Sequence, residues 1–344
     1  GFTLVNNPSC YTWTDSSHQV MEEDKRWALI SEVGGDTGYL EELADVLKRH
    51  FHLICLREFL QNPALHGPKV QVLFIWKFLP EAEPSLLRSL PALLLVASGG
   101  VGVDHLDVPF INGLGVKVAN TPGVVSDSTA DHAMALLLAS ARKILDGEFK
   151  GHTTHLPQRL MGVEVTRATL GIVGMGDIGY KIAQRSKGFE MKILYHNRTR
   201  RTGAAERATG AEFCRRLDDL LKRSDFVVIA VKLTADTTGL IGRRELSLMK
   251  PTATLVNVSR GLVVDQDALV EALRSGRIGA AALDVTHPEP LPRDHPLLGL
   301  PNVLITPHMG ISTNATATAI VEKMLENGLA AVKGLPVPDE VKLQ

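Results

Sequence analysis

The sequence predicts an α/β protein with two doubly wound parallel sheets. Short apolar runs recur along most of its 344 residues, and segments with helical periodicity separate them. Such alternation is typical of parallel sheets whose helices cover both faces. A glycine-rich turn at residues 174–179 lies between an apolar run and a helical segment, and it marks the start of the second sheet.

The first series of strands and helices is expected from residue 26 to residue 119. Its strands are predicted at residues 27–30, 52–56, 70–76, 93–97 and 116–119. Between the first two strands, a helix face is indicated by the spacing of Leu40, Leu43 and Leu47. Residues 1–25 are polar and aperiodic, so we expect them to form a flexible tail.

A long helix is predicted at residues 126–142, after the turn signal at residues 120–123. The helix is almost wholly apolar, which requires burial between domains or between subunits. We favour a contact between subunits, because so many apolar side chains need a partner. The helix therefore predicts a homodimer.

The second series begins with a strand at residues 169–173, a helix that ends near residue 188 and a strand at residues 191–195. Further strands are predicted at residues 226–231, 253–258, 280–285 and 303–306, and helices at residues 217–222, 242–249 and 266–275. A last helix at residues 314–333 has Ile320 and Met324 on an apolar face. We expect it to return and pack on the first sheet.

The glycine turn predicts a dinucleotide site in a Rossmann-like unit. Gly174 permits the tight turn, Gly176 lets the backbone approach a pyrophosphate, and Gly179 lets the helix pack closely on the strand. The free N–H groups and the positive end of the helix then hold the phosphates. Asp177 and Ile178 lie in the same turn and belong to the predicted cofactor site.

The segment after the next strand predicts NADP(H) as the cofactor. An acid that would accept a hydrogen bond from the adenosine ribose is missing from residues 196–201, where the sequence has Asn197, Arg198, Thr199 and Arg201. Guanidinium groups grip phosphate oxygens bidentately, so these residues suit a 2′-phosphate. A solvated basic turn beside an NAD(H) site is the alternative.

Composition argues against several classes of partner. The 37 Lys and Arg residues nearly balance 38 Asp and Glu residues, so neither a nucleic acid nor a membrane surface is expected as a partner. The longest apolar runs are far shorter than the ~18 residues that span a bilayer. The 3 cysteines are scattered without metal-ligand spacing, which predicts no metal site and favours a cytoplasmic, reducing compartment.

Charged residues follow three strands of the second series, which is an unusual place for them. They are Arg260, the pair Asp284 and Glu289, and His308. The carboxyl ends of parallel strands border the ligand crevice of such a sheet. We therefore expect these groups to converge on the nicotinamide of the cofactor.

Taken together, these motifs resemble the D-2-hydroxyacid dehydrogenase family. The segments that carry the resemblance are residues 101–107, 121–131, 174–179, 257–261, 283–292 and 307–310. Within the family, the chain is most similar to the NADPH-dependent glyoxylate/hydroxypyruvate reductases. The resemblance implies a discontinuous substrate-binding domain, residues 26–119 plus 311–344, and an NADP-binding Rossmann domain, residues 120–310.

The resemblance also implies the reaction, in which a small 2-oxo acid is reduced to the D-2-hydroxy acid. His308 would be the proton donor, and Glu289 would orient its ring and keep it protonated. Arg260 would bind the carbonyl and carboxylate oxygens of the substrate. Backbone N–H groups of Val101 and Gly102 would hold the carboxylate from the opposite domain.

At the nicotinamide end, the resemblance assigns four further cofactor contacts. Asp284 would accept a hydrogen bond from the carboxamide, Val258 and Gly310 would line the site, and Lys232 would touch the cofactor. Four other histidines are expected to be structural, namely His105, His132, His287 and His295. Of these, His287 is expected to come closest to the site.

Three departures from the reductase pattern leave the substrate open. Asp177 puts a negative charge beside the pyrophosphate, Ile311 replaces a serine, and residues 151–161 lack the tryptophan that the reductases lend to a neighbouring subunit. A substrate similar to 2-ketogluconate is also compatible with these changes to the pocket wall.

Two other functions remain as alternatives. One is an NAD-dependent relative, such as a formate or phosphoglycerate dehydrogenase. The formate type would have glutamine in place of Glu289, and the phosphoglycerate type would have an acid near Asn197. The other is a corepressor-like module that senses NAD(P) and can retain the catalytic residues.

Overall fold

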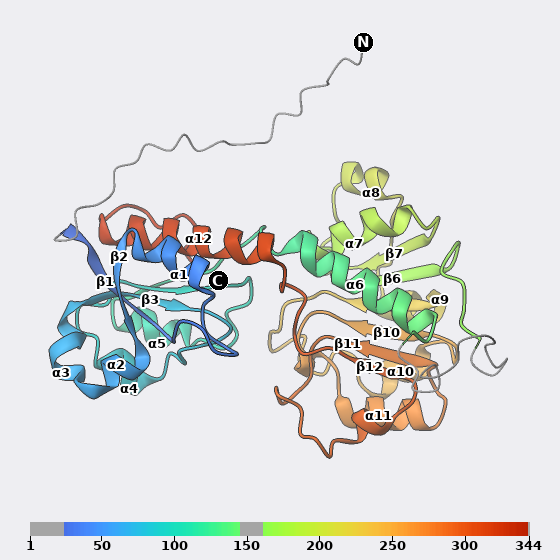
Figure 1. Ribbon diagram of the computed structural model, residues 1–344. Helices are drawn as coiled ribbons and strands as arrows, with labels where there is room; N and C mark the ends of the chain where they lie inside the picture. Colours follow the sequence, from blue (N-terminus) through green and yellow to red (C-terminus); the bar gives the residue numbers. More distant parts are fainter. Residues whose placement is uncertain (1–23, 145–160, 343–344) are drawn as a thin grey trace, which may run out of the picture.

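The computed structural model describes residues 24–144 and 161–342, and it forms two lobes that are each built on one parallel sheet (Figure 1). The strand order is β2-β1-β3-β4-β5 in the five-stranded sheet and β12-β11-β10-β9-β6-β7-β8 in the seven-stranded sheet. The predicted fold class is therefore confirmed. The expected tail and the departure noted at residues 151–161 lie almost wholly outside the described residues.

The first lobe contains the N-terminal elements and the last helix. Its strands are β1 (Arg26–Ile30), β2 (Phe51–Cys55), β3 (Val70–Ile75), β4 (Leu95–Ser98) and β5 (Lys117–Ala119). Its helices are α1 (Glu41–Lys48), α2 (Leu56–Gln61), α3 (Pro63–His66), α4 (Pro84–Arg88), α5 (Val108–Gly113) and α12 (Asn314–Val332).

The second lobe follows the order expected for a dinucleotide-binding sheet. Its strands are β6 (Thr169–Val173), β7 (Lys192–His196), β8 (Glu212–Phe213), β9 (Phe226–Ile229), β10 (Thr254–Asn257), β11 (Ala280–Leu283) and β12 (Val303–Ile305). Its helices are α6 (Ser126–Ala141), α7 (Asp177–Lys187), α8 (Gly203–Thr209), α9 (Leu217–Arg223), α10 (Arg243–Leu248) and α11 (Gln266–Arg274).

Both sheets are buried on both faces, as double winding requires. In β3, the neighbouring residues Phe74 and Ile75 belong to apolar clusters on opposite faces of the first sheet. In β9, Val227 and Val228 do the same for the second sheet. Continuous apolar strands are the consequence, because successive side chains alternate between two covered faces.

Helix α6 corrects one prediction. Its apolar residues Ala133, Met134 and Leu137 are buried within this chain, in a cluster with the second sheet and with Ile182 of α7. The partner that these side chains need is therefore supplied by the same subunit. The composition of this helix consequently gives no support for a homodimer.

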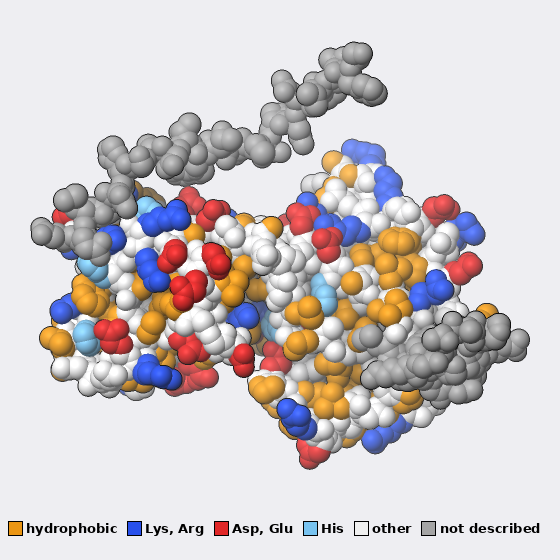
Figure 2. All heavy atoms as spheres, viewed as in Figure 1, with side chains coloured by type: hydrophobic (Ala, Val, Ile, Leu, Met, Phe, Trp, Pro, Cys, Tyr) orange, Lys and Arg blue, Asp and Glu red, His pale blue; other side chains and the backbone are white. Residues whose placement is uncertain are grey.

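Helix α12 does return to the first lobe, as its apolar face predicts. In Figure 1 the helix lies against the first lobe. Ile320, Val321 and Met324 are fully buried in one cluster with Phe74 of β3. The chain thus leaves the first lobe through α6, builds the second sheet and comes back. This path leaves a hollow between the lobes in the space-filling view (Figure 2).

Within residues 24–144 and 161–342, no helix combines the length and the apolar character that crossing a membrane requires.

Candidate active site

The glycine turn before α7 has the geometry of a phosphate cradle. Gly174 has a φ of 102°, in the left-handed region that favours glycine. A Cβ on Gly179 would lie 2.0 Å from the Gly174 carbonyl oxygen, whereas a Cβ on Gly176 would have no atom within 4 Å. The turn therefore packs tightly against its own strand and is open at Gly176, which fits the approach of a pyrophosphate to the N-terminus of α7.

Asn197 takes part in this turn in a way that the sequence did not reveal. Its side-chain oxygen accepts a hydrogen bond of 2.7 Å from the Met175 N–H. The residue after β7 thus pins the glycine turn. This hydrogen bond to Met175 explains the position of Asn197 without any contact between its side-chain oxygen and the ribose.

The three arginines after β7 have different surroundings. Arg200 forms two hydrogen bonds of 2.8 Å with Glu206, whose pKa falls to about 2 because Arg200 and Tyr195 donate to its carboxylate. Arg198 and Arg201 are exposed and form no ion pair with the described part of the chain. These two guanidinium groups are therefore available to a phosphate, while Arg200 is already occupied.

The remaining residues expected around the cofactor lie at the same edge of the sheet. Asp177 and Lys232 are exposed, Ile178 is half-buried against the apolar cluster under α6 and α7, and Val258 is 7% exposed. Thr199 is exposed beside Arg198. Solvent thus reaches both charged side chains, Asp177 and Lys232.

Arg260 is held by contacts from both lobes. Asn257 donates to its carbonyl oxygen, and its own Nη1 donates to the Ser259 carbonyl oxygen at 3.0 Å. Its Nε lies 3.0 and 3.1 Å from the two carboxylate oxygens of Asp104 in the first lobe. A Cβ on Gly102 would lie 1.9 Å from its Nη2, so only glycine lets the guanidinium come this close.

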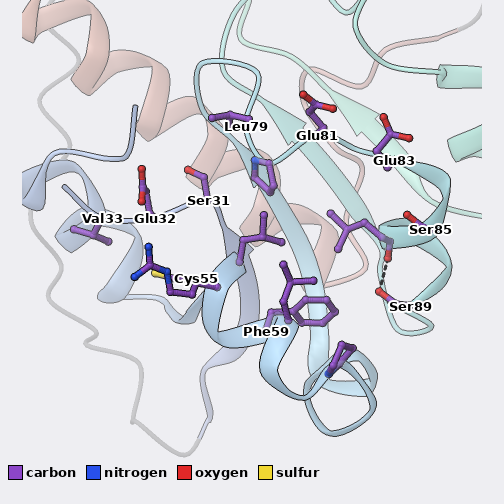
Figure 3. Close-up of a pocket in the computed structure, with 16 residues that line it drawn as sticks. Ser31, Glu32, Val33, Cys55, Phe59, Leu79, Glu81, Glu83, Ser85 and Ser89 are labelled. Carbon is purple, nitrogen blue, oxygen red and sulfur yellow. Dashed lines mark hydrogen bonds between the residues drawn. The ribbon is translucent and has the colours of Figure 1, made fainter. Parts of the chain in front are cut away.

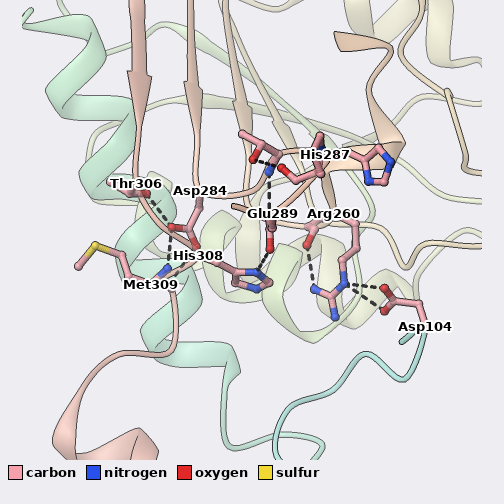
Figure 4. Close-up of polar contacts among 12 residues, drawn as sticks. Asp104, Arg260, Asp284, His287, Glu289, Thr306, His308 and Met309 are labelled. Atoms are coloured by element: carbon pink, nitrogen blue, oxygen red, sulfur yellow. Dashed lines mark hydrogen bonds and ion pairs between the residues drawn. The ribbon is translucent and has the colours of Figure 1, made fainter. Parts of the chain in front are cut away.

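His308 and Glu289 form the predicted pair. His308 Nδ1 lies 2.9 Å from one carboxylate oxygen of Glu289, and the other oxygen accepts a hydrogen bond from the Thr286 N–H at 3.0 Å (Figure 4). The His308 backbone has a φ of 50°, which is uncommon for a residue with a side chain. Its N–H donates to the Asp284 carbonyl oxygen at 2.8 Å, which fixes this turn after β12.

Asp284 is buried, with a side chain only 3% exposed. Its carboxylate accepts hydrogen bonds from the Met309 N–H at 2.8 Å and from the Gly310 N–H at 2.9 Å. Thr306 Oγ1 and His132 Nε2 also contact it, at 2.6 and 3.1 Å. Burial alone would raise the pKa of Asp284, but the hydrogen bonds from His132, Thr306 and Met309 outweigh burial and lower it.

The structure corrects the expectation for two histidines. His132 of α6 lies beside Asp284 and Thr306, whereas His287 is hydrogen-bonded to Gln266 through its backbone. The residue expected to come closest to the site is therefore not the one in its hydrogen-bond network. The position of His132 on α6 follows from the sequence, but its contact with Asp284 does not, because the two residues are far apart in the chain.

The loop after β4, which contains Gly100, Val101 and Gly102, is fixed by side chains that follow β5. Thr121 Oγ1 accepts from the Gly100 N–H at 2.8 Å, and Asn120 donates to the Val101 carbonyl oxygen at 2.8 Å. Gly100 has a φ of 134°. Among the described residues, the N–H groups of Val101 and Gly102 have no backbone acceptor, so both are free to donate to a ligand.

Two residues of the site were missed by sequence reasoning. Asp104 lies in a motif that was noted, but its pairing with Arg260 joins residues 156 positions apart and could not be inferred locally. Phe78 lies in a two-residue turn in which both Lys77 and Phe78 have positive φ. Its ring centroid lies 5.5 Å from that of His308 and 5.0 Å from that of His105.

These contacts bring Arg260 and His308 to one side of the strand ends. Phe78 touches His308 and His105, and His105 follows Asp104, which holds Arg260. Figure 4 shows the two side chains next to each other beyond the ends of the strands. A planar cation and an imidazole with a carboxylate partner can together bind a carboxylated carbonyl compound and transfer a proton to it.

Comparison with known proteins identifies this arrangement. Residues 134–310 match the family model of the D-isomer specific 2-hydroxyacid dehydrogenase, NAD binding domain. The chain belongs to the D-2-hydroxyacid dehydrogenase family. It is accordingly an NAD(P)-dependent oxidoreductase that acts on the CH–OH group of donors, and it is close to the glyoxylate reductases.

Several reductases are among the relatives of this dehydrogenase. It is 44% identical to the glyoxylate reductase of Pyrococcus furiosus over 73% of this chain and 76% of that protein. The glyoxylate reductase of Thermococcus gammatolerans is 40% identical over 86% of this chain and 90% of that protein. A solved structure of an NADPH-dependent glyoxylate/hydroxypyruvate reductase from Sinorhizobium meliloti, in complex with NADP and malonate, superposes with a TM-score of 0.78 at 28% identity, covering 92% of this chain and 96% of that one.

Proposed function

We propose that this dehydrogenase reduces a small 2-oxo acid such as glyoxylate or hydroxypyruvate to the D-2-hydroxy acid with NADPH. The observation that carries the proposal is the His308–Glu289 pair at 2.9 Å beside Arg260, whose Nη2 reaches Gly102 of the opposite lobe. Relatives named glyoxylate reductase support the substrate class.

The roles of the residues follow from the free donors in the site. Arg260 binds the carbonyl and carboxylate oxygens of the substrate through Nη2, since its Nε is taken by Asp104. The N–H groups of Val101 and Gly102 bind the carboxylate from the other side. His308 donates a proton from Nε2 to the developing alkoxide, while Glu289 holds Nδ1 and stabilises the charged ring.

The nicotinamide cofactor, when bound, supplies the hydride. The turn at Gly174, Gly176 and Gly179 holds its pyrophosphate, together with the backbone of Asp177 and Ile178 at the start of α7. Val258, Gly310 and Lys232 line the nicotinamide side, and Asp284 keeps one carboxylate oxygen with a single hydrogen bond, from Gly310, for the carboxamide. These groups orient the cofactor next to His308.

The preference for NADPH rests on Arg198, Thr199 and Arg201. Arg198 and Arg201 are exposed, have no ion pair among the described residues and follow β7, the strand that ends at the ribose in this type of sheet. Each charged hydrogen bond to a 2′-phosphate contributes roughly 1.5–3 kcal/mol.

We also propose that the enzyme is a cytoplasmic homodimer. Cys55 and Cys214 are both free, as expected in a reducing compartment. Ile144, Met161 and Val163 are 59%, 64% and 53% exposed, and Val163 bonds to the backbone at the end of α6. Exposed apolar residues gathered in this way favour an interface. Light scattering of the purified chain gives the subunit number directly.

Steady-state turnover with a substrate panel tests the reaction. Glyoxylate, hydroxypyruvate and 2-ketogluconate would each be offered with NADPH and with NADH. We expect turnover of the two short acids with NADPH as the better cofactor, and a product of D configuration. Cofactor binding without turnover of any 2-oxo acid would contradict the proposal and favour an NAD(P)-sensing role.

A further inference from the structure

A cavity lies in the first lobe, away from the cofactor turn. It has a volume of about 1050 Å³ and is formed where β1, β2 and β3 end and α2 and α4 begin (Figure 3). In the first sheet, β1 lies between β2 and β3. The chain therefore passes from β1 to β2 on one side and then crosses to β3 on the other side. Ligands of open α/β sheets bind at the carboxyl ends of strands at such a switch point.

The walls of this cavity are mainly apolar. Leu56, Phe59 and Leu60 come from α2, and Leu79 and Leu86 come from the segment that leads into α4 and from α4 itself. A concave apolar surface of this size can enclose a small organic molecule. None of these residues takes part in the site described above, although Leu79 follows Phe78 directly.

The polar groups of the cavity are unbalanced in charge. Three carboxylates, those of Glu32, Glu81 and Glu83, line it together with one guanidinium, that of Arg57. In Figure 3, Glu81 and Glu83 lie on one side and Glu32 on the other. Neither the Glu81 carboxylate nor the Glu83 carboxylate has an ion pair or hydrogen bond with the residues that the structure describes, although the Glu83 backbone carbonyl accepts from the Leu87 N–H at the start of α4. An apolar recess with unpaired carboxylates at its rim attracts cations.

A buried hydroxyl in the cavity also lacks a partner. Ser31 lines the cavity and is 9% exposed, and its Oγ forms no hydrogen bond with the described part of the protein. Buried hydroxyl groups are nearly always hydrogen-bonded, so this oxygen is an unsatisfied polar group in the wall of the cavity. The hydroxyl oxygen can accept a hydrogen bond from an ammonium group, which carries three N–H donors.

We propose that this cavity is a second binding site, for a small organic ammonium compound with an apolar body. The ammonium group lies against Glu81 and Glu83, and the body is enclosed by Phe59, Leu79 and Leu86. Neutral and anionic compounds of the same shape bind less well, because the rim offers three carboxylates and one cation.

The cavity shares a wall with the turn that carries Phe78. Trp76 and Leu79 exchange two backbone hydrogen bonds, of 2.8 and 2.9 Å, across the turn, so Phe78 and Leu79 move together. A ligand packed against Leu79 therefore acts on the Phe78 ring beside His308. This coupling rests on the proposed function, whereas binding to the cavity does not.

Fluorescence titration with dansylcadaverine tests the site on the full chain. The probe has a primary ammonium group and an apolar body, and its emission rises in an apolar environment. Saturating NADP⁺ is present so that the probe cannot enter the cofactor cleft. We expect its N-acetylated, neutral analogue to bind about 3-fold to 10-fold more weakly, the scale for loss of contacts with partly exposed carboxylates.

Variants locate the probe. The double substitution Glu81→Gln with Glu83→Gln should weaken dansylcadaverine about 3-fold to 10-fold and leave the neutral analogue unchanged. Ser85→Trp, which fills the mouth from the exposed side of α4, should weaken both compounds. Glu322→Gln on the exposed side of α12 is the matched control and should change neither.

Equal binding of the two probes, or binding that survives both the double substitution and Ser85→Trp, would overturn the proposal. Absence of any binding at millimolar probe would do the same. The coupling is measured separately, as a change of at least ~2-fold in the KM for glyoxylate when the cavity is saturated. If no 2-oxo acid is turned over, the proposed function is wrong. The dansylcadaverine titration still tests whether the cavity binds an ammonium compound.

Discussion

The two sides of the cleft are built in different ways. The cofactor side is local, because Gly174, Gly176 and Gly179 act within one turn and one helix. The reacting side is assembled from distant parts, since Arg260 is paired with Asp104 of the other lobe and His308 is covered by Phe78. A glycine motif therefore reveals the phosphate turn of the first side, while the second side becomes visible only when the lobes are placed together.

This difference separates chemistry from selection. The groups proposed to react, His308, Glu289 and Arg260, all follow strands of the second sheet. The groups that enclose the substrate, Gly102, Asp104 and Phe78, all come from turns and loops of the first lobe. Substitutions on the two sides should consequently affect different kinetic constants.

The largest effect is expected at the proton donor. His308→Ala should lower kcat by at least ~100-fold, the usual scale for removal of a general acid. Steady-state rates of NADPH oxidation with glyoxylate measure kcat. His287→Ala is the matched control, because His287 is exposed nearby and is hydrogen-bonded to Gln266 through its backbone. Equal loss in both variants would place the effect on folding instead of proton transfer.

A smaller effect is expected where the lobes meet. Asp104→Asn should lower kcat/KM about 10-fold to 30-fold, because Arg260 loses the charge that holds its Nε and the guanidinium is less well positioned. KM should change more than kcat. Asp107→Asn is the control, since asparagine also caps α5 in place of Asp107. Unchanged kinetics in Asp104→Asn would mean that the pair is not needed for substrate binding.

Substitutions on the cofactor side should change the ratio of kcat/KM for NADPH to kcat/KM for NADH. Arg198→Ala should reduce the preference for NADPH over NADH by about 10-fold, since one charged hydrogen bond to phosphate is lost. Arg200→Ala is the matched control and should leave the ratio nearly unchanged, because Arg200 is already paired with Glu206. A larger shift from Arg200 than from Arg198 would reverse this assignment.

The smallest effect concerns stability at the boundary of the lobes. Burial lowers the pKa of His105 from 6.5 to about 4, so the folded state holds the ring neutral and the unfolded state binds a proton first. Stability from this group is complete above pH 6.5 and is lost as the pH falls towards 4. Between pH 7 and pH 5.5 the free energy of unfolding should fall by about 1 kcal/mol.

Urea unfolding at several pH values measures how the free energy of unfolding depends on pH. His105→Gln should remove the part of this dependence that comes from His105. Comparison with the unsubstituted chain isolates His105 from the other titrating groups. An identical slope in both proteins would mean that the ring is protonated in the folded state as readily as in the unfolded chain.

The sequence predicted the long elements well, because their periodicity reflects burial. All strands of both sheets except β8, and helices α6, α7, α11 and α12, lie within about two residues of their predicted ends. Short elements such as α3 and β8 were missed, since four and two residues are too few to show a period. Helix α8 was missed because its seven residues include no large apolar side chain that could mark a buried face. The predicted strand also ran past Leu283 of β11, because the apolar Val285 follows Asp284 although the ladder has already ended.

By itself the sequence determined the fold class, the phosphate turn and the three groups at the strand ends, because each depends on neighbours along the chain. Tertiary structure alone decided that α6 is covered within the subunit, that Asn197 pins Met175, and that Arg260 pairs with Asp104. These outcomes depend on which surfaces meet after folding. Residues far apart in the chain select one another by shape and charge, and no local pattern records that choice.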